Sequence, residues 1–377
     1  MTKKRILHFF VDEKVVNRAI YNFDSVFPGG CRYVVVTPSE DYTPKHVKAE
    51  HPDLTLAPYN SPRFIEAVGD VSQYQYILIH LLTWQMVDFV LNHPHSGYCW
   101  GVWGSDLYNE FVEYMGYNCY YDKEEALRFM GKMKLKHRLL LYPYLRFKHK
   151  LMAKRKRKAI KRISFVSAIP GDRDLLIKYC PEVSCMGMKR GGYYPVDAIV
   201  DKKLLETPLG TNIVLGHSAY AAGNHVEIFR QLASIPLGDR KVIVPLSYGD
   251  VAPYILYQGK EIIGDHFCPL TEFIPLDDYN ELMHSASTYI FNSYRQAAVG
   301  NIIPALYMGA TVFMNERSPL VTYFRNDLGC VFFLTSELAE RIDYRLTETE
   351  IKQNREAILK RYSEQAIFHA IRESYGQ

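Results

Sequence analysis

Short, continuously apolar runs alternate with longer amphipathic stretches along most of this 377-residue chain. In the first half, the runs expected to form strands are 5–10, 31–37, 74–81, 97–104 and 162–169. A strand that is apolar on both faces must be covered on both faces, as in a parallel sheet with helices on either side. The alternation therefore predicts a doubly wound α/β fold with a mostly parallel sheet.

The second half of the chain repeats this pattern. Strands are expected at 211–219, 240–249, 271–276, 287–293 and 310–316. Helices are expected at 224–234, 254–264, 277–286, 300–309 and 345–376. Two similar halves indicate the glycosyltransferase B type of α/β fold, in which two Rossmann-like domains face a central cleft. Ligands of such folds bind at the carboxyl ends of the strands.

The length of the chain suits two domains of roughly 150–200 residues each. The best boundary lies near 193–211, a stretch of mixed polarity that carries two prolines. We therefore expect an N-terminal domain over 1–200, a C-terminal domain over 201–345 and further helices over 346–377. A basic helical insertion is expected within the first domain at about 125–162.

The composition, with 48% hydrophobic and 23% charged residues, is that of an ordinary globular protein. Its seven cysteines form no CxxC pair, so neither a disulfide framework nor a zinc site is predicted. The most apolar window, 76–91, carries His80, Gln85 and Asp88, which argues against a membrane-spanning helix. The apolar run after the basic N-terminus is broken at Asp12, which favours a strand over a signal peptide. We expect no metal and no cofactor.

The sequence "IFNSYRQAAVGNIIPALYMG" predicts an anion site. A strand ends at Asn292, a polar loop with Arg295 and Gln296 follows, and a helix begins near Gly300 and Asn301. A helix N-terminus beside an arginine binds phosphate well, because its first N–H groups have no partner within the helix. The guanidinium would grip a diphosphate with two hydrogen bonds. The alternative is an ordinary strand–helix corner with a surface arginine.

The sequence "LGHSAYAAGNHVEIF" predicts a second corner of the same kind. Ser218, Gly223 and Asn224 lead into a helix whose backbone N–H groups would receive a phosphate, with His217 as a further donor. The alternative is that the glycines merely permit the turn. Tyr248 ends a third corner, where it would stack on a base, bind a phosphate or simply cover the surface.

The sequence "WGVWGSDLY" places one carboxylate, Asp106, at the end of an aromatic strand. Beside Trp103 and Ser105, this group would handle the proton of an acceptor as a general base. The alternative is that Asp106 caps the helix expected after it.

The segment Lys132–Arg162 contains fourteen Lys and Arg and no Asp or Glu, which leaves 31 basic and 41 acidic residues elsewhere. Leu140, Tyr144, Phe147 and Leu151 recur at helical spacing, so the segment predicts an apolar helix face flanked by cations. Such a helix lies in the interface of an anionic membrane. A solvated helix is the main alternative. Nucleic acid is the least favoured partner, because no binding module accompanies the charge.

Several motifs occur together in the order of one bacterial family. They are "WGSDLY", "LGHSAYAAGNH", "VPLSYGD", "LTEFIPLDDYNELM" and "IFNSYRQAAVGNI". With them the chain resembles the TDP-N-acetylfucosamine:lipid II N-acetylfucosaminyltransferase family of enterobacterial common antigen synthesis. The resemblance runs from about residue 95 to 315 and is most specific over 211–310.

The resemblance implies a peripheral enzyme at the cytoplasmic face of the bacterial inner membrane. It would move 4-acetamido-4,6-dideoxygalactose, or a fucose-like sugar, from a dTDP-sugar to a polyprenyl-diphosphate-linked oligosaccharide. The first domain would bind the acceptor and the second the nucleotide sugar. By motif, the donor side would include Ser218, Asn224, Tyr248, Asn292, Arg295, Gln296 and Asn301, and the acceptor side Trp103 and Asp106.

Two features depart from that pattern. The basic insertion is heavier than the family needs, and Pro304 stands where many retaining enzymes of this fold carry a glutamate. A UDP- or GDP-sugar donor and a non-enzymatic, membrane-docked nucleotide-sugar-binding protein therefore remain alternatives. An epimerase would need a GxGxxG loop after the first strand, and that loop is absent from the sequence.

Overall fold

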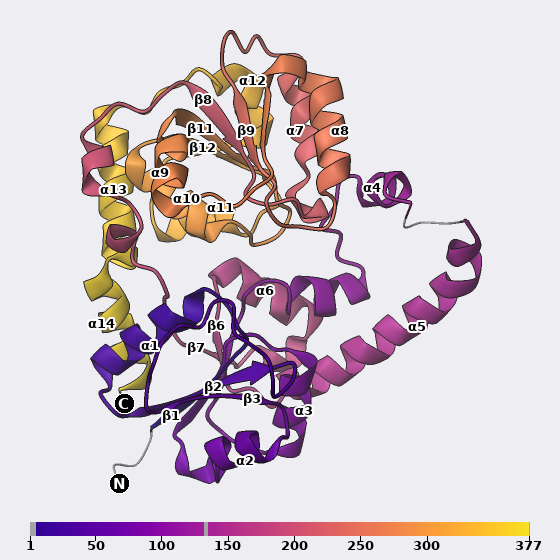
Figure 1. Cartoon of the computed structure of the whole chain (residues 1–377), viewed down its shortest axis with the longest axis vertical. Helices are drawn as coiled ribbons and strands as arrows, with labels where there is room; N and C mark the ends of the chain where they lie inside the picture. Colours follow the sequence, from indigo (N-terminus) through magenta and orange to yellow (C-terminus); the bar gives the residue numbers. More distant parts are fainter. Residues whose placement is uncertain (1–4, 132–134, 377) are drawn as a thin grey trace. The chain divides into compact units, whose positions relative to one another are not determined.

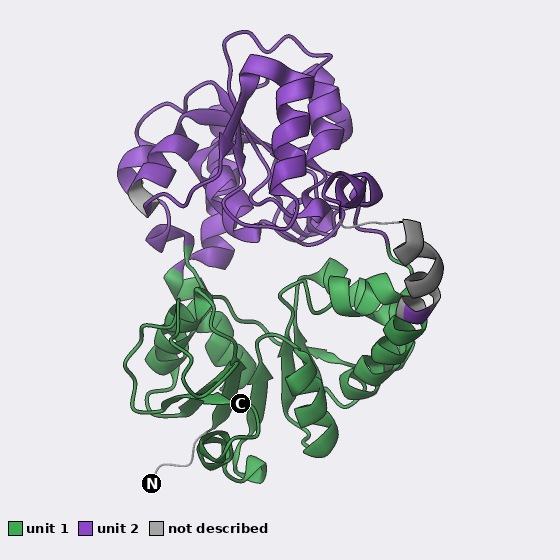
Figure 2. Cartoon of the chain, turned by 45° about the vertical axis from the view of Figure 1, so that its right-hand side comes forward, with its two compact units in different colours: residues 1–117, 147–195, 364–377 green, residues 118–146, 196–363 purple. Residues whose placement is uncertain are grey.

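The computed structural model describes residues 5–131 and 135–376, without the side chains of 135–143, 145–146 and 276–277. The chain forms two compact units (Figure 2). Unit 1 comprises Met1–Tyr117, Phe147–Pro195 and Glu364–Gln377, and unit 2 comprises Asn118–Arg146 and Val196–Ser363. The change of unit after Pro195 falls inside the stretch in which the domain boundary was expected.

Unit 1 is built on a parallel sheet with the strand order β3-β2-β1-β4-β5-β6-β7. Its strands are β1 (Ile6–Phe10), β2 (Cys31–Thr37), β3 (Leu54–Pro58), β4 (Tyr76–Ile79), β5 (Tyr98–Gly101), β6 (Phe165–Ser167) and β7 (Gly187–Met188). Its helices are α1 (Val15–Val26), α2 (Pro62–Val68), α3 (Trp84–Asn92), α6 (Pro170–Tyr179) and α14 (Glu364–Tyr375). The strand order reverses between β1 and β4, so a ligand is expected at the carboxyl ends of these strands.

Unit 2 is built on a second parallel sheet, with the order β10-β9-β8-β11-β12-β13. Its strands are β8 (Asn212–Leu215), β9 (Val242–Pro245), β10 (Phe267–Leu270), β11 (Ala286–Phe291), β12 (Thr311–Met314) and β13 (Phe333–Leu334). Its helices are α4 (Lys123–Phe129), α7 (His225–Leu232), α8 (Ala252–Ile263), α9 (Leu276–His284), α10 (Val299–Met308), α11 (Leu320–Thr322), α12 (Leu338–Arg341) and α13 (Glu348–Tyr362). Helices α7 and α8 pack together on one side of this sheet, and α10 packs against α13 (Figure 1).

Both sheets therefore have the Rossmann strand order, and the predicted α/β fold class of two Rossmann-like domains is confirmed. The sheets form because their strands are apolar on both faces. All six residues of β11 and all five of β1 are buried. In unit 2 the switch in strand order lies between β8 and β11, which are the strands that lead into the two predicted phosphate corners.

Some elements differ from the prediction. Residues 271–275 form a loop, and the strand is the preceding β10, where a proline at position 269 masks the strand pattern. The helices expected as one group over 346–377 belong to different units, α13 to unit 2 and α14 to unit 1. Helix α5 (Leu135–Ile160) begins in the unit 2 segment and continues into unit 1, so the basic insertion is not confined to the first domain.

None of the helices within the described residues is both long enough and apolar enough to span a membrane.

The chain returns to unit 1 through α14, which buries Ile367, Ile371 and Tyr375 in the core that also contains Ile6 and Phe23. We predict that Ile371→Ala lowers the free energy of unfolding by about 2–5 kcal/mol, because a buried aliphatic side chain leaves a cavity. Urea denaturation measures this loss. The neighbouring exposed residue serves as a control, and Arg372→Ala should change stability by less than about 0.5 kcal/mol. An equal effect of both variants would contradict the packing of α14 in this core.

Candidate functional site

The loop after β8 folds closely around one histidine of unit 2. Gly216 has φ +73°, and a Cβ there would lie 2.5 Å from Nε2 of His225; a Cβ at Gly223 would lie 2.4 Å from the same ring. Only glycine fits either position without a shift of this ring. Gly223, predicted to bind the donor, therefore also makes room for His225 at the start of α7.

The loops after β8 and β11 meet at a pair of asparagines. Asn224 Nδ2 donates to the backbone oxygen of Asn292 (3.1 Å), and Asn292 Nδ2 donates to the backbone oxygen of Asn224 (3.0 Å). Both side chains are buried. The structure thus brings the two predicted phosphate corners side by side, as a shared anion site requires.

These two amides shape the corner rather than reach into it. Asn224 Nδ2 also donates to the backbone oxygen of Cys119, and Asn292 Nδ2 also donates to Glu227 (2.6 Å). An amide has two N–H donors, so both are used within the protein. Neither side chain is placed to donate to a phosphate, which corrects the expectation that both would line the donor. Asn224 stands at the N-cap position of α7 and makes no side-chain cap hydrogen bond.

A larger polar network extends from this pair and was not predicted. Asn315 Nδ2 donates to Asn292 Oδ1 (2.7 Å), and Tyr294 Oη donates to Glu227 (2.7 Å). Burial and this carboxylate raise the pKa of Tyr294. The network links residues far apart in the sequence, so no local pattern could have indicated it.

His217, Ser218 and Arg295 lie at the same corner. Burial and then the positive charge of Arg295 lower the pKa of His217 to about 4. His217 is therefore neutral near pH 7, and Arg295 supplies the positive charge of this corner. Ser218 is buried, with its Oγ 3.4 Å from Nε2 of His217. The pairing of a neutral imidazole with a guanidinium fits a site that receives an anion.

The first turn of α10 is open on its outer side. A Cβ at Gly300 would contact nothing within 4 Å, and Gln296 is half-buried. The helix begins after Ala298, which has φ +60°, and Asn301 Nδ2 donates to Tyr279 Oη (2.8 Å). This ten-residue helix therefore presents its N-terminus to any ligand held by Arg295.

Two half-exposed tyrosines border the corner. Tyr220 and Tyr248 are 43% and 50% exposed, and their rings meet edge to face with centroids 6.0 Å apart. Burial and the nearby Tyr248 raise the pKa of Tyr279 to about 12. Tyr248, Tyr279 and Asn301 are therefore neighbours. Tyr220 and Tyr279 were not predicted. We use the name donor corner, after the predicted role, for His217, Tyr248, Arg295, Gly300 and Asn301.

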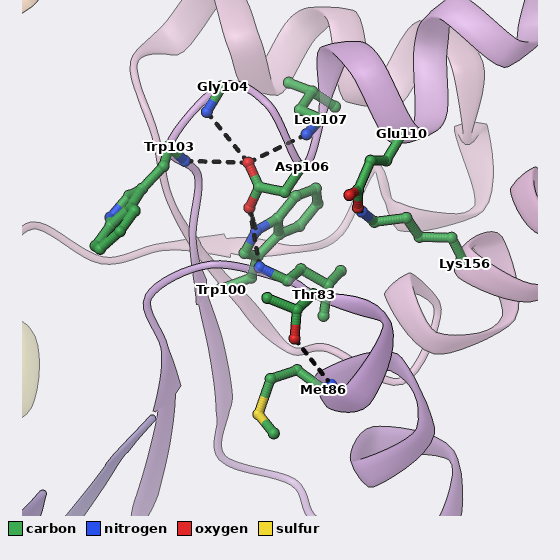
Figure 3. A network of polar contacts seen from close by, with 10 residues as sticks. Thr83, Met86, Trp100, Trp103, Gly104, Asp106, Leu107, Glu110 and Lys156 are labelled. Atoms are coloured by element: carbon green, nitrogen blue, oxygen red, sulfur yellow. Dashed lines mark hydrogen bonds and ion pairs between the residues drawn. The ribbon is translucent and has the colours of Figure 1, made fainter. Parts of the chain in front are cut away.

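In unit 1, Asp106 lies in the loop after the carboxyl end of β5, as predicted (Figure 3). Its side chain is buried. One oxygen accepts hydrogen bonds from the backbone N–H groups of Trp103, Gly104 and Leu107 at 3.1–3.2 Å. The other accepts from the N–H of Leu82 (3.0 Å) and from Trp100 Nε1 (2.6 Å).

Five donors exceed the roughly four lone-pair sites of a carboxylate, so no position remains for the proton of an acceptor. The geometry favours a loop-organising role for Asp106 over that of general base. The alternative that Asp106 only caps the following helix is also too narrow. Its carboxylate binds N–H groups of the loop 103–107 and of Leu82, just before α3. A π-helical turn, Tyr108–Val112, follows.

Trp103 and Ser105 remain accessible at the loop that Asp106 organises. Ser105 is exposed and Trp103 is half-buried. Trp103 Nε1 donates to Tyr193 Oη (2.7 Å), which lies 2.9 Å from His80 Nδ1, and His80 Nε2 lies 2.9 Å from His8 Nδ1. This chain of hydrogen bonds fixes the orientation of the Trp103 ring. Burial lowers the pKa of His80 to about 3 and holds the pKa of His8 well below its usual value, so both rings are neutral.

Within the described ranges, 5–131 and 135–376, no group of three His, Cys, Asp or Glu side chains is arranged to hold a metal ion.

No protein-family model matches the chain. Its fold is similar to those of several solved glycosyltransferases. Sucrose-phosphate synthase from Thermosynechococcus elongatus aligns with a TM-score of 0.62 and 15% identity, over 99% of this chain and 98% of the other. HepE from Anabaena, solved with UDP and glucose, aligns with a TM-score of 0.60 and 12% identity, over 99% and 100%. Trehalose 6-phosphate synthase from Burkholderia multivorans gives 0.58 and 11%, over 100% and 98%.

These alignments cover both units of the chain, and they show that it has the two-domain fold of these glycosyltransferases.

The two roles of Asp106 lead to different results for Asp106→Asn. We predict a loss of about 3 kcal/mol or more in the free energy of unfolding, since an Asn nitrogen would face buried donors, each costing about 1–3 kcal/mol when unsatisfied. Urea denaturation followed by tryptophan fluorescence measures it. A variant as stable as the wild type, with glycosyl transfer lost and donor binding intact, would instead support the base role.

Proposed function

We propose that this protein is a glycosyltransferase that uses a nucleotide-diphosphate sugar. The observation that carries the proposal is the donor corner. Two loops at the switch point of a Rossmann-like sheet are held together by Asn224 and Asn292, and they bring Arg295 and the N-terminus of α10 to one place. A guanidinium beside a helix N-terminus is suited to a diphosphate. The fold shared with known glycosyltransferases supports this choice.

In the proposed reaction, the bond between the anomeric carbon of the sugar and the diphosphate breaks, and a hydroxyl oxygen of the acceptor bonds to that carbon. The leaving diphosphate gains negative charge, which Arg295 and the first N–H groups of α10 would stabilise. The hydroxyl loses its proton. Since Asp106 is saturated with hydrogen bonds, the proposed reaction releases this proton to solvent.

We propose dTDP as the nucleotide of the donor and 4-acetamido-4,6-dideoxygalactose or a related deoxyhexose as its sugar. The motifs of 211–310 support this choice through the family that they resemble. Anabaena HepE was solved with UDP-glucose, which makes UDP the second candidate. Tyr248 and Tyr220 offer aromatic surface next to the corner, where a base or sugar ring would stack.

We further propose that the acceptor is a polyprenyl-diphosphate-linked oligosaccharide and that the protein works at the cytoplasmic face of the bacterial inner membrane. Helix α5 supports this proposal. Tyr144, Phe147 and Leu151 lie on one stripe of the helix and are 60%, 67% and 59% exposed. Leu140 belongs to the same predicted face, but its side chain lies outside the described residues. A helix with exposed apolar side chains among cations suits an anionic membrane surface.

The structure reduces the number of cations available for such a surface. Several basic residues near the end of the segment bind protein groups: Arg155 binds Asp88, Lys156 binds Glu110, Arg157 and Lys161 bind Glu182, and Arg162 donates to the backbone of Val90 and Leu91. Lys148, Lys150, Lys154 and Lys158 are exposed, and none of them forms an ion pair with a residue that the structure describes. Residues 132–134 of the predicted segment lie outside the described residues.

The first test concerns the donor. We predict that dTDP binds in isothermal titration, and that Arg295→Ala lowers the transfer rate by about 10²–10³, equivalent to about 2.7–4 kcal/mol of transition-state stabilisation. Lys352→Ala removes one charge from the exposed face of α13 and should leave both measurements unchanged. Binding of none of dTDP, UDP and GDP would reject the proposal in favour of a scaffold, and normal turnover of Arg295→Ala would reject the role of this residue.

The second test concerns the membrane. We predict that the protein sediments with phosphatidylglycerol vesicles and is released as the salt concentration rises. Salt screens the attraction between the cations and the lipid, because the range over which charges act falls to about 10 Å at 0.1 M. Lys148→Gln and Lys154→Gln should each weaken binding about fivefold, at about 1 kcal/mol per cation. Arg157→Gln removes a cation that is already paired with Glu182 and should have less effect. Equal binding to neutral and anionic vesicles would contradict the proposal.

A further inference from the structure

Helix α5 has two different faces within the part that belongs to unit 1. Phe147, Leu151, Lys154 and Lys158 follow one another at intervals of four, three and four residues on the exposed face. His149, Ala153, Lys156 and Ile160 follow the same intervals on the opposite face. Ala153, Lys156 and Ile160 are buried. The proposed membrane face and the inner face are therefore opposite sides of one rigid element.

The inner face contacts the segment that follows Asp106 at two places. Lys156 Nζ binds Glu110 Oε2 at 2.8 Å, and Glu110 lies in the π-helical turn Tyr108–Val112 (Figure 3). Two α-helical turns earlier on α5, the ring of His149 stacks on Tyr114, with centroids 4.2 Å apart and planes 10° apart. The loop that carries Trp103, Ser105 and Asp106 thus continues directly into a segment held by α5.

Lys156 is an unusual residue for this position because its side chain is 0% exposed. A fully buried lysine persists only when it is paired. Glu110 provides the ion pair, the ring of Trp84 lies 5.2 Å from Nζ, and the carboxylate of Asp106 is near enough to act on it. Burial lowers the pKa of Lys156, and the two carboxylates oppose that effect. The cation therefore joins the helix to the segment that follows Asp106.

We propose that Lys156 and Glu110 are positioning residues that connect the membrane-docking helix to the loop 103–107, so that docking of α5 on an anionic membrane changes the conformation of this loop. The inference rests on the proposed membrane attachment and deepens it, because it makes the acceptor side of the site sensitive to the surface that carries the acceptor. A π-helical turn suits this role, since such turns are frequent at functional sites.

The three tryptophans of the chain allow a test that needs no glycosyl transfer. Trp84 lies beside Lys156, Trp100 donates to Asp106, and the backbone of Trp103 donates to Asp106. None lies in α5, so a change in tryptophan emission on vesicle binding reports on this network and not on insertion of the helix. Phosphatidylglycerol vesicles are the probe, and phosphatidylcholine vesicles are the control.

We expect anionic vesicles to shift the tryptophan emission of the wild type. The shift should be lost in Lys156→Met and Glu110→Gln, although both variants still sediment with the vesicles, because Lys156 is buried and cannot touch lipid. Lys158→Met, on the exposed face, should bind vesicles about fivefold more weakly yet show the full shift once bound. If Lys156→Met does not fold, Glu110→Gln alone tests the connection, because Gln keeps the size and one acceptor oxygen of the Glu side chain.

Sedimentation and emission separate the two ways in which the idea fails. A wild type that sediments without any shift, or a shift that Glu110→Gln retains, would overturn the connection while leaving the membrane proposal intact. A wild type that does not sediment would overturn both. With a water-soluble acceptor assayed on phosphatidylglycerol vesicles, loss of the connection should raise the KM for the acceptor while kcat is kept, and without vesicles the variant and the wild type should have the same KM.

Discussion

The mutual hydrogen bonds between Asn224 and Asn292 are the interaction on which the proposed chemistry depends. Each amide donates to the backbone of the other, and both are buried, so the loops after β8 and β11 are fixed to one another. A buried polar network is rigid when all its members are satisfied. That rigidity holds Arg295 and the start of α10 in place before a ligand arrives, and preorganised charge of this kind is most effective in catalysis.

Most of the fold could be predicted from the sequence, because strands buried on both faces carry a strong local signal. Strands β1, β2, β4, β8 and β11 were expected within a few residues of where they lie. Strand β10 and the division of the C-terminal helices were not. The first contains a proline, and the second depends on which core buries Ile367 and Ile371 after the chain has folded. Such packing choices between distant segments leave no periodic trace in the sequence.

The strand ends that carry the candidate site residues could be predicted, whereas their binding roles stay predictions. The sequence indicated the corners of Arg295 and Asp106 correctly as strand ends. It did not indicate that the Asp106 carboxylate would be enclosed by five donors, because four of them are backbone N–H groups, which every residue but proline supplies. A role in phosphate binding was inferred for Asn292 because it is an amide at a strand end. In the structure its side chain bonds Glu227 and Asn315, which come from other elements and which the local sequence does not indicate.

Four histidines of the two units share a property with a general consequence. His8, His80, His217 and His225 are all held neutral, chiefly by burial, while the same rings in an unfolded chain would take up protons near pH 6.5. Below that pH the unfolded chain binds more protons than the folded one, so acid favours unfolding. The cores around these rings would therefore be among the first places to loosen in an acidic environment.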